Sequence, residues 1–447
     1  MSDPIRFSKL LALACLLGVA MPAMAASQQV IDASKAGVIG DGATLNTASI
    51  QKVIDETAAG GGGVVDFPAG RYLTGTIELK SRVTLRLEKD AVLLGSTNPS
   101  DYRNVDPFID GSGNPMGHAL IVAVGADHVG IEGSGTVDGQ GRKLADNQKP
   151  YAIRPFLLRW VRSSNVVVKD VHLTNPGAWT LNFFETKGAV VDGVTIRSRD
   201  QKLHNNDGVN IDSSQDIRVT NCDVVSGDDA LVIKSTGATP TRGITASNCK
   251  LSSHTNAIKL GTESYGGFED VTVSHCEITN TDMAGIALYA VDGGDLRKVT
   301  IIDVTMDGVS VPISIRLGAR LKTFRPGQQP RPAAGSLRDV VIRNVDAKNV
   351  RMIGMLINGV PDHPVEHIEF SNVRLELPGG GSEAAAALQL PEKEAAYPEF
   401  NMFGKTLPAY GMYMRHARGI TFNDVHMQAL APDARPAKIL IDVEEAR

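Results

Sequence analysis

The chain has 447 residues, of which 42% are hydrophobic and 21% charged, so it can bury a large core and is not a disordered protein. Its 45 basic and 50 acidic residues give a formal net charge of -5, which argues against a nucleic-acid binder working through a basic surface. The length favours two or three ordinary domains unless the chain is repetitive, because repeat architectures grow in one dimension.

Residues 1–25 have the pattern of a secretory signal peptide. Two basic residues precede an apolar run over 10–20, and Ala23-Met24-Ala25 matches the small-x-small site of signal peptidase. The run is too short to span a bilayer, which takes ~20 apolar residues, and no later segment reaches that length. We therefore expect a mature domain over 26–447 that is secreted or periplasmic and free of the membrane. The alternative is an uncleaved anchor.

The next predicted element is a helix over residues 48–59. A turn and an N-cap within 40–47 precede it, and the glycines at 60–63 end it. No later segment has a comparable helical pattern. Because the open end of a stack of repeats has to be covered, we expect this helix to cap the N-terminal end of the domain.

A short strand motif recurs along most of the remaining chain. Its central Val or Cys stands at 171, 194, 222, 249, 276, 304, 345 and 373, at intervals of 23, 28, 27, 27, 28, 41 and 28 residues. Periods of this size are typical of stacked units. Each unit holds two or three short β-rich runs and no crossover helix, so successive units must coil. We therefore predict an all-β fold, a single-stranded parallel β-helix with coils ~4.8 Å apart.

Three cysteines, Cys222, Cys249 and Cys276, occupy the same position in successive repeats. Because valine replaces them in the other repeats, we predict that they form an internal ladder of buried free thiols. A disulfide is the alternative, since neighbouring coils meet the ~4.4–6.8 Å Cα separation that a bridge needs.

Two intervals exceed the repeat and hold Pro- and Gly-rich insertions, at about 323–335 and 378–410. Insertions in a solenoid are loops on one face, and this is often the binding face. We expect these two loops to wall off a binding site.

Alignment of the strands between 205 and 320 brings polar residues onto one outward face. Strand residues alternate between inside and outside, and the equivalent inward positions are Val209, Leu231, Ile258, Ile286 and Ile313. The neighbouring outward ladders are Asn210, Val232, Lys259, Ala287, Ser314 and Asp212, Lys234, Gly261, Tyr289, Arg316. Asp207 on one coil then lies beside Asp228 and Asp229 on the next.

Three converging carboxyl groups are suited to glycoside hydrolysis. Clustered acids repel one another, which raises the pKa of at least one and places a proton donor beside a base. Alternatively, Asn206-Asp207-Gly208 and Gly227-Asp228-Asp229 are simply turn sequences. Their coincidence on adjacent coils favours a catalytic site.

These motifs resemble glycoside hydrolase family 28, the polygalacturonases and rhamnogalacturonan hydrolases. Asn205-Asn206-Asp207-Gly208 is similar to the family's Asn-x-Asp motif and Gly227-Asp228-Asp229 to its Asp-Asp motif, and the likeness covers roughly 30–430. The resemblance implies a right-handed parallel β-helix, no cofactor or metal, and hydrolysis with inversion. It makes Asp228 the general acid, while Asp207 and Asp229 hold and deprotonate the attacking water. An inverting pair of acid and base must leave room for that water, which requires carboxyl groups ~6.5–9.5 Å apart.

Two elements of the family pattern are missing. Its Gly-His-Gly element falls at Thr255-Asn256-Ala257, so Asn256 stands at the histidine position and His254 is a candidate substitute. Its Arg-x-Lys element, which grips a galacturonate carboxylate, falls at 287–289, where Tyr289 could stack on a sugar. The other residues that we expect to bind substrate are Asn205, Lys259, Glu263 and Arg316, with Glu263 at the rim. Lys234 and Lys259 are alternatively ion-pair partners of the acids.

The resemblance implies a monomeric, pectin-degrading hydrolase whose partner is a pectic polysaccharide or oligosaccharide and not nucleic acid. Homogalacturonan and rhamnogalacturonan both remain open as substrates. A calcium-dependent polysaccharide lyase is an alternative in which the three acids bind the metal, although no arginine base stands beside them. A non-catalytic carbohydrate-binding solenoid is another, although it gives no reason for three convergent acids.

Overall fold

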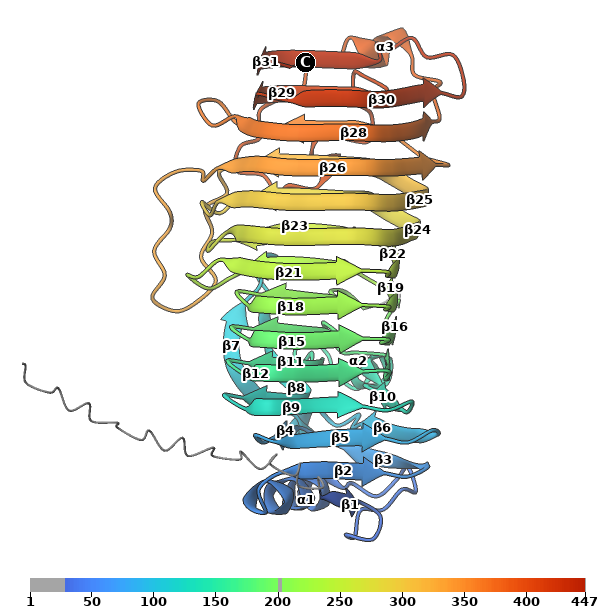
Figure 1. The fold of residues 1–447 in the computed structure, drawn as a ribbon, viewed down its shortest axis with the longest axis vertical. Coiled ribbons are helices and arrows are strands. Elements are labelled where there is room, and N and C mark those ends of the chain that lie inside the picture. The colour runs from blue at the N-terminus through green and yellow to red at the C-terminus, as the bar shows by residue number, and fades with distance from the viewer. Residues whose placement is uncertain (1–28, 200–202, 447) are drawn as a thin grey trace, which may run out of the picture.

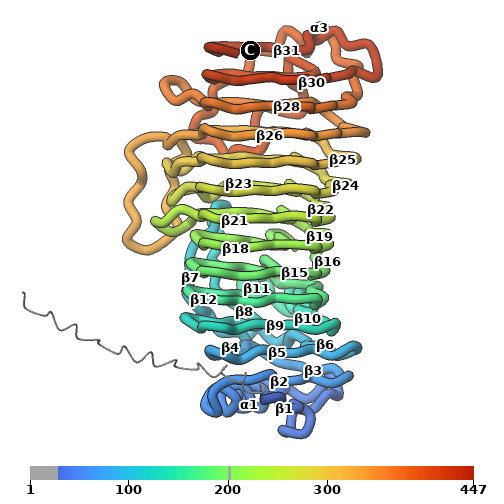
Figure 2. Tube along the Cα trace, in the orientation of Figure 1, coloured from blue at the N-terminus to red at the C-terminus, as the bar shows by residue number. Residues whose placement is uncertain are grey.

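The computed structural model describes residues 29–199 and 203–446, which form one column of stacked coils (Figure 1). The tube view follows the chain level by level from the N-terminal to the C-terminal end (Figure 2). Strands of successive coils pair in parallel, so three sheets run along the column. The protein is a parallel β-helix, and the prediction from the repeat is confirmed. The predicted signal peptide lies outside the described residues.

The first sheet contains the strands that follow the predicted aspartates. Its members are β4 (Ile77–Leu79), β8 (Pro115–Val124), β11 (Phe156–Val161), β14 (Leu181–Phe184), β17 (Val209–Asp212), β20 (Leu231–Ser235), β23 (Ile258–Ser264), β27 (Met355–Asn358), β29 (Met412–Arg418) and β31 (Lys438–Glu444). A hairpin is added to it where β7 (Asn104–Ile109) pairs antiparallel with β8.

The other two sheets complete each coil. The second contains β1 (Val30–Asp32), β2 (Gly63–Phe67), β5 (Val83–Leu87), β9 (Asp127–Glu132), β12 (Ser164–Lys169), β15 (Lys187–Asp192), β18 (Gln215–Thr220) and β21 (Thr241–Ser247). The third contains β3 (Gly70–Thr74), β6 (Ala91–Gly95), β10 (Thr136–Asp138), β13 (His172–Thr174), β16 (Thr195–Arg197), β19 (Asp223–Ser226) and β22 (Lys250–Ser253).

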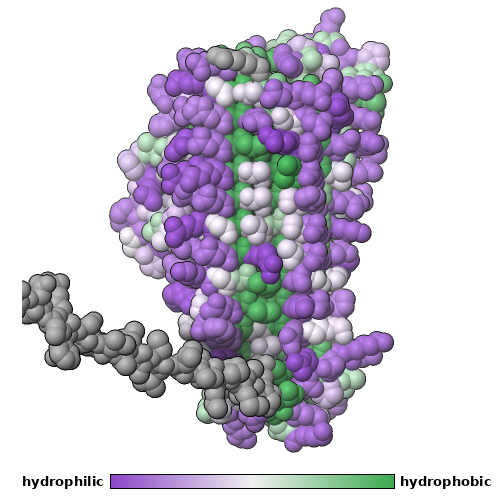
Figure 3. Space-filling model, viewed as in Figure 1, coloured by the Kyte–Doolittle hydropathy of each residue, from purple (hydrophilic) through white to green (hydrophobic). Residues whose placement is uncertain are grey.

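Longer strands continue the column toward the C-terminus. They are β24 (Phe268–Ala290), β25 (Leu296–Leu317), β26 (Leu337–Lys348), β28 (Val365–Leu377) and β30 (Thr421–Ala429). β24 pairs with β21, β22 and β23, so it bends through all three sheets. The face in Figure 3 belongs to the second sheet, where a band of apolar and weakly polar side chains runs between hydrophilic margins.

Helix α1 (Thr47–Ala59) covers the N-terminal end of the column, as expected (Figure 1). Its buried residues Ile50, Val53 and Ile54 belong to the main core. The Asn46 side chain bonds the main chain of Ile39 and does not cap the helix. The other helical segments are η1 (Pro99–Asp101), α2 (Gly141–Asp146), α3 (Glu383–Ala386) and η2 (Phe400–Phe403). Among the described residues, no helix has the length and apolar character needed to cross a membrane.

Inward side chains form continuous ladders along the core. Cys222, Cys249 and Cys276 are buried in it as free thiols, and Cys276 pairs in register with Val304 of the next coil. The predicted thiol ladder is therefore confirmed and the alternative disulfide is not formed.

The strand alignment near the aspartates is also confirmed, with one local exception. Val209 pairs with Leu231, Leu231 with Ile258, and Ile258 with Ile286. Between β20 and β23 the register shifts after Ile233, so Lys234 and Gly261 are not paired as the predicted ladder requires.

The insertions lie beside the first sheet. The segment between β25 and β26 forms the long loop at the left of Figure 1, and its Gln328 bonds Thr236 O at 2.7 Å. The segment between β28 and β29 reaches Lys259, where Glu399 Oε1 lies 2.7 Å from Nζ. Outward residues that look exposed in the strand pattern are consequently buried beneath these loops.

Candidate active site

The three aspartates lie together before two neighbouring strands. Asp207 is two residues before β17, and Asp228 and Asp229 form the turn before β20, which pairs with β17. A hydrogen bond of 2.8 Å from Gly208 N to Asp229 O ties the two turns together. Asp207 and Asp229 are buried, with 1% and 3% of their surface exposed, whereas Asp228 is only partly buried. Asp228 is therefore the aspartate closest to solvent.

Lys234 joins Asp207 to Glu263. Its Nζ is 3.5 Å from Asp207 Oδ2 and 3.3 Å from Glu263 Oε2, and it lies 4.3 Å from the centre of the Trp179 ring. Although burial opposes the charge, the two carboxylates raise the pKa of Lys234, so it remains a cation. Burial raises the pKa of Asp207, and Lys234 opposes that rise. Asp207 therefore binds a proton more readily than an exposed aspartate.

Lys259 makes the matching connection on the next coil, joining Asp229 to Glu399. Its Nζ is 3.0 Å from Asp229 Oδ2 and 2.7 Å from Glu399 Oε1. Asn256 Nδ2 donates to Asp229 Oδ1 at 2.9 Å and lies 3.2 Å from Glu399 Oε1. Burial opposes ionisation of Asp229, but Lys259 and Lys234 hold its pKa below the usual value. Asp229 is therefore a carboxylate at neutral pH.

Asp228 has no ion pair with any described residue. Its Oδ1 accepts from Asp229 N at 3.0 Å and lies 2.8 Å from Thr255 Oγ1, which is also 2.8 Å from Asp229 Oδ1. Because a hydroxyl has one proton to donate, the two acids share Thr255. Burial and then the charge of Asp229 raise the pKa of Asp228 to about 6. The site thus places two carboxyl groups with raised pKa values, those of Asp207 and Asp228, beside Asp229, whose pKa is lowered.

Comparison with known proteins identifies the family. The model of "Glycosyl hydrolases family 28" matches residues 63–396. The chain belongs to this family. It is 28% identical over 378 residues to a probable polygalacturonase of Vitis vinifera, covering 79% of this chain and 74% of that one. It is 27% identical over 292 residues to an endo-polygalacturonase of Pectobacterium carotovorum subsp. carotovorum, covering 60% and 71%. The protein is a glycoside hydrolase.

A solved structure of the same family has the same fold. The family 28 exopolygalacturonase of Yersinia enterocolitica superposes with a TM-score of 0.75 at 22% identity, covering 94% of this chain and 78% of that one. Its likeness supports the β-helix architecture along nearly the whole column.

Several residues proposed from the family 28 pattern lie at the acids. Asn256 bonds Asp229, and Lys259 is an ion-pair partner, the alternative role considered for it. Asn205 Nδ2 is 3.4 Å from Asp228 Oδ2, and its Oδ1 accepts from Arg154 Nη2 at 2.8 Å. Asn205 therefore links Asp228 to a cation that the sequence pattern did not single out.

Other candidates are placed differently from the expectation. Glu263 is buried, with its Oε1 accepting from Gly111 N at 2.8 Å, so it is not a rim acid. His254 Nδ1 pairs with Asp282 at 2.8 Å, and no hydrogen bond joins it to the three aspartates within the described residues. It therefore does not take over the contacts of the missing family histidine.

Tyr289 and Arg316 are not open to a sugar. Tyr289 is fully buried and its hydroxyl lies 3.0 Å from Ser314 Oγ, so stacking on a ring is closed to it. Arg316 donates to the main-chain oxygens of Gly359, Glu392 and Lys393, at 2.9, 3.2 and 3.1 Å. Arg316 thus anchors the second insertion. The sequence-based expectation failed because that insertion covers these strands.

Residues that the sequence analysis missed complete the site. Tyr397 is 42% exposed and its ring centre lies 5.8 Å from Lys259 Nζ, so it is the accessible aromatic beside the acids. Thr255 directly precedes Asn256, which stands at the histidine position of the family motif, so the motif could have pointed to Thr255. Glu399 and Tyr397 had none, because they come from an insertion outside the repeat.

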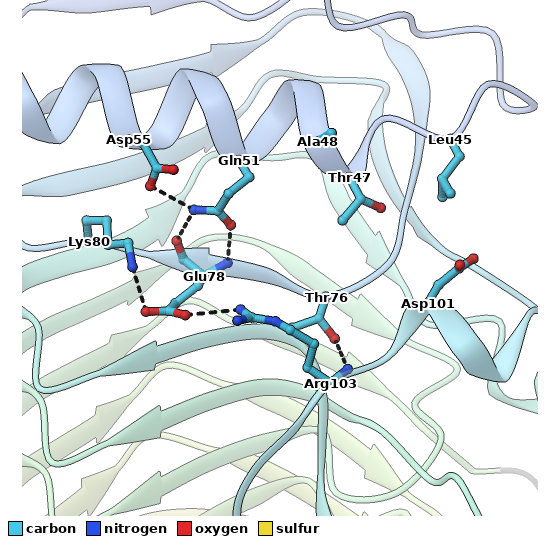
Figure 4. Close-up of a pocket in the computed structure, with 10 residues that line it drawn as sticks. All are labelled: Leu45, Thr47, Ala48, Gln51, Asp55, Thr76, Glu78, Lys80, Asp101 and Arg103. Atoms are coloured by element: carbon cyan, nitrogen blue, oxygen red, sulfur yellow. Dashed lines mark hydrogen bonds and ion pairs between the residues drawn. The ribbon is translucent and has the colours of Figure 1, made fainter.

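A separate pocket of about 540 Å³ lies between α1 and the first coils (Figure 4). Gln51 bonds the main chain of Glu78 at 2.8 and 3.0 Å, and the Glu78 carboxylate pairs with Lys80 at 2.6 Å and Arg103 at 3.0 Å. These hydrogen bonds and ion pairs are made within the pocket itself, and those of Gln51 tie the capping helix to β4. In residues 29–199 and 203–446, no cluster of three or more His, Cys, Asp or Glu is arranged as a metal site.

Proposed function

We propose that this glycoside hydrolase is secreted and cleaves a pectic polysaccharide with inversion, using Asp228 as general acid and Asp207 with Asp229 to activate water. The observation that carries the proposal is the contrast between Asp228 and Asp229. Asp229 is paired with a lysine 3.0 Å away, while Asp228 lacks an ion pair among described residues and has a pKa of about 6. Glycoside hydrolysis needs such a divided set of carboxyl groups.

Asp228 fits the acid step by position as well as by charge. It is the only partly exposed member of the three, so its proton can reach a glycosidic oxygen bound above the site. Protonation of that oxygen allows the C–O bond to break as positive charge develops on the sugar ring. Asp228 leaves the step as a carboxylate, which the nearby Lys259 and Lys234 stabilise.

The buried pair fits the water step. Asp229 is held ionised by Lys259, and Asp207 has a raised pKa, which makes it the stronger proton acceptor whenever it is ionised. A water held between them attacks the anomeric carbon on the face opposite the leaving oxygen. Inversion ordinarily needs ~6.5–9.5 Å between the acid and the base, and this separation remains a prediction for Asp228 and Asp207. Asp228 Oδ1 and Asp229 Oδ1 are closer together than that range, because both lie 2.8 Å from Thr255 Oγ1.

The pectic substrate is supported by the family and by relatives named polygalacturonases. The positive charge at the acids is already committed to Asp207, Glu263, Asp229 and Glu399, which favours a rhamnogalacturonan-type substrate over homogalacturonan. Arg154, linked through Asn205 to Asp228, could hold a uronate in a flanking position. The two lysines also repel a cation, so the arrangement speaks against a calcium-dependent lyase.

Product analysis on homogalacturonan and rhamnogalacturonan in parallel tests the proposal. We expect reducing ends to appear without the ultraviolet absorbance of unsaturated sugars, and faster on rhamnogalacturonan fragments. Unsaturated products would indicate a lyase, and no turnover on any pectic fraction would indicate a binding protein. Secretion is tested by the N-terminal sequence of the exported protein, which should begin after Ala25.

A further inference from the structure

Glu399 enters the site from the insertion between β28 and β29. It is 8% exposed, and its Oε1 lies 2.7 Å from Lys259 Nζ. Asn256 Nδ2 lies 3.2 Å from each of the two carboxylate oxygens of Glu399. The next residue, Phe400, begins η2 and packs in a buried cluster with Leu407 and other apolar residues. Packing of the insertion therefore holds Glu399 against Lys259.

The contact uses the charge that an acidic sugar would need. Lys259 already lies 3.0 Å from Asp229, so Glu399 is its second carboxylate. A third carboxylate, from a uronate, would have to displace Glu399 or approach two negative groups around one ammonium.

Two further cations around the subsite at Lys259 are also paired with carboxylates. Lys234 lies 3.5 Å from Asp207 and 3.3 Å from Glu263. Arg320 forms a two-point pair with Asp292, at 2.9 Å through Nε and 2.6 Å through Nη2. Within the described residues, none of these cations has spare charge for a sugar carboxylate.

Tyr397 supplies a neutral contact at the same place. It stands two residues before Glu399, and its partly exposed ring lies 5.8 Å from Lys259 Nζ and 5.6 Å from Arg320 Cζ. An aromatic ring packs well against the apolar face of a sugar and does not neutralise a carboxylate.

We propose that Glu399 is a specificity-determining residue that reserves the subsite at Lys259 for an uncharged sugar unit. Its carboxylate occupies the place on Lys259 where the carboxylate of a uronate would bind, and Tyr397 offers a surface to a neutral ring. This inference rests on the proposed function, since it concerns the substrate of the same site. An uncharged unit is a neutral sugar or a uronate whose carboxyl group is esterified.

The test compares ligands that differ only in charge. Trigalacturonate and its full methyl ester are titrated calorimetrically into D228N, D228N/E399Q and D228N/E383Q, because the D228N change slows turnover. Glu383 is an exposed residue of the same insertion, so E383Q makes the same change of charge away from the site. The acid should bind D228N/E399Q about tenfold or more tighter than D228N, because one carboxylate no longer competes for Lys259. The ester should bind both equally, and E383Q should change neither.

Equal affinity of the acid for D228N and D228N/E399Q, or no binding of the acid to the latter, would overturn the inference. If E399Q prevents folding, the affinities of the acid and the ester for D228N are compared instead. The ester should bind D228N at least as tightly as the acid does. Tighter binding of the acid would refute the role of Glu399. Hydrolysis by the wild type is measured separately. If the wild type hydrolyses a pectic substrate but the binding test fails, only the inference about Glu399 is refuted. If the wild type hydrolyses no pectic substrate, the proposed function is refuted.

Discussion

Replacement of Asp228 by Asn should abolish most activity and at the same time stabilise the fold at neutral pH. Asn has nearly the shape of a protonated Asp, so the contacts with Thr255 Oγ1 and Asp229 N at 2.8 and 3.0 Å can be retained. It cannot donate a proton to a leaving oxygen. We expect kcat to fall on the order of 10²–10⁴-fold, as for other general acids.

The stability gain follows from the raised pKa of Asp228. This pKa is about 6 in the fold against 3.8 for an ordinary aspartate, a difference that corresponds to about 3 kcal/mol. The stabilisation that the protonated group provides is complete below about pH 4 and is lost as the pH rises to about 6. D228N has no such loss. Its free energy of unfolding should therefore exceed that of the wild type by about 2–3 kcal/mol at pH 7 and match it at pH 4.

Urea unfolding at both pH values, beside initial rates on a pectic substrate, checks both parts. D216N is a matched control, because Asp216 is an exposed residue of strand β18 in the second sheet, away from the three aspartates, and its replacement should change neither quantity. Activity of folded D228N within tenfold of the wild type would refute the general-acid assignment. Equal stability of D228N and wild type at pH 7 would show that the fold does not raise the pKa of Asp228.

Three further changes test the contacts around the acids and the packing of the core. K259M leaves Asp229 and Glu399 without their shared ammonium, so the pKa of Asp229 should rise and kcat should fall at least about tenfold. The acidic limb of the pH profile of kcat/KM should then move to higher pH. An unchanged profile would show that Lys259 does not keep Asp229 ionised. T255V removes the hydroxyl shared by Asp228 and Asp229 and should lower kcat about tenfold with little change in KM, measured by initial rates, with the exposed T272V as control. C249V should lower the free energy of unfolding in urea by less than about 1.5 kcal/mol, because valine occupies the equivalent core position in other coils. A reducing agent should not shift the unfolding transition of the wild type, since the thiols are free. A shift on reduction would reveal a disulfide.

The column and its register could be predicted from the sequence because each coil repeats the same local pattern. The Val and Cys positions at 23- to 28-residue intervals indicate stacking, and stacking places Asp207 beside Asp228 and Asp229 without knowledge of any long-range contact. The family motifs fall directly before β17 and β20, so the same alignment of the coils predicts both the fold and the candidate catalytic acids.

The walls of the site could not be predicted in this way. Glu399 is 140 residues from its partner Lys259 and lies in an insertion that has no counterpart in the repeat, so no register places it. Outward positions such as Tyr289 and Arg316 were assigned to the substrate because strand alternation says only which way a side chain points. The insertion covers Arg316, and Tyr289 is fully buried with its hydroxyl against Ser314, which the alternation cannot show.

The stereochemistry of the first product tests the central claim most directly. Proton NMR during hydrolysis of a pectic oligosaccharide by the wild type shows the anomer released before mutarotation. The proposed roles of Asp207, Asp228 and Asp229 predict the anomer opposite to the bond that is cleaved, because water attacks from the far side. Release of the retained anomer, or of an unsaturated sugar, would contradict the mechanism.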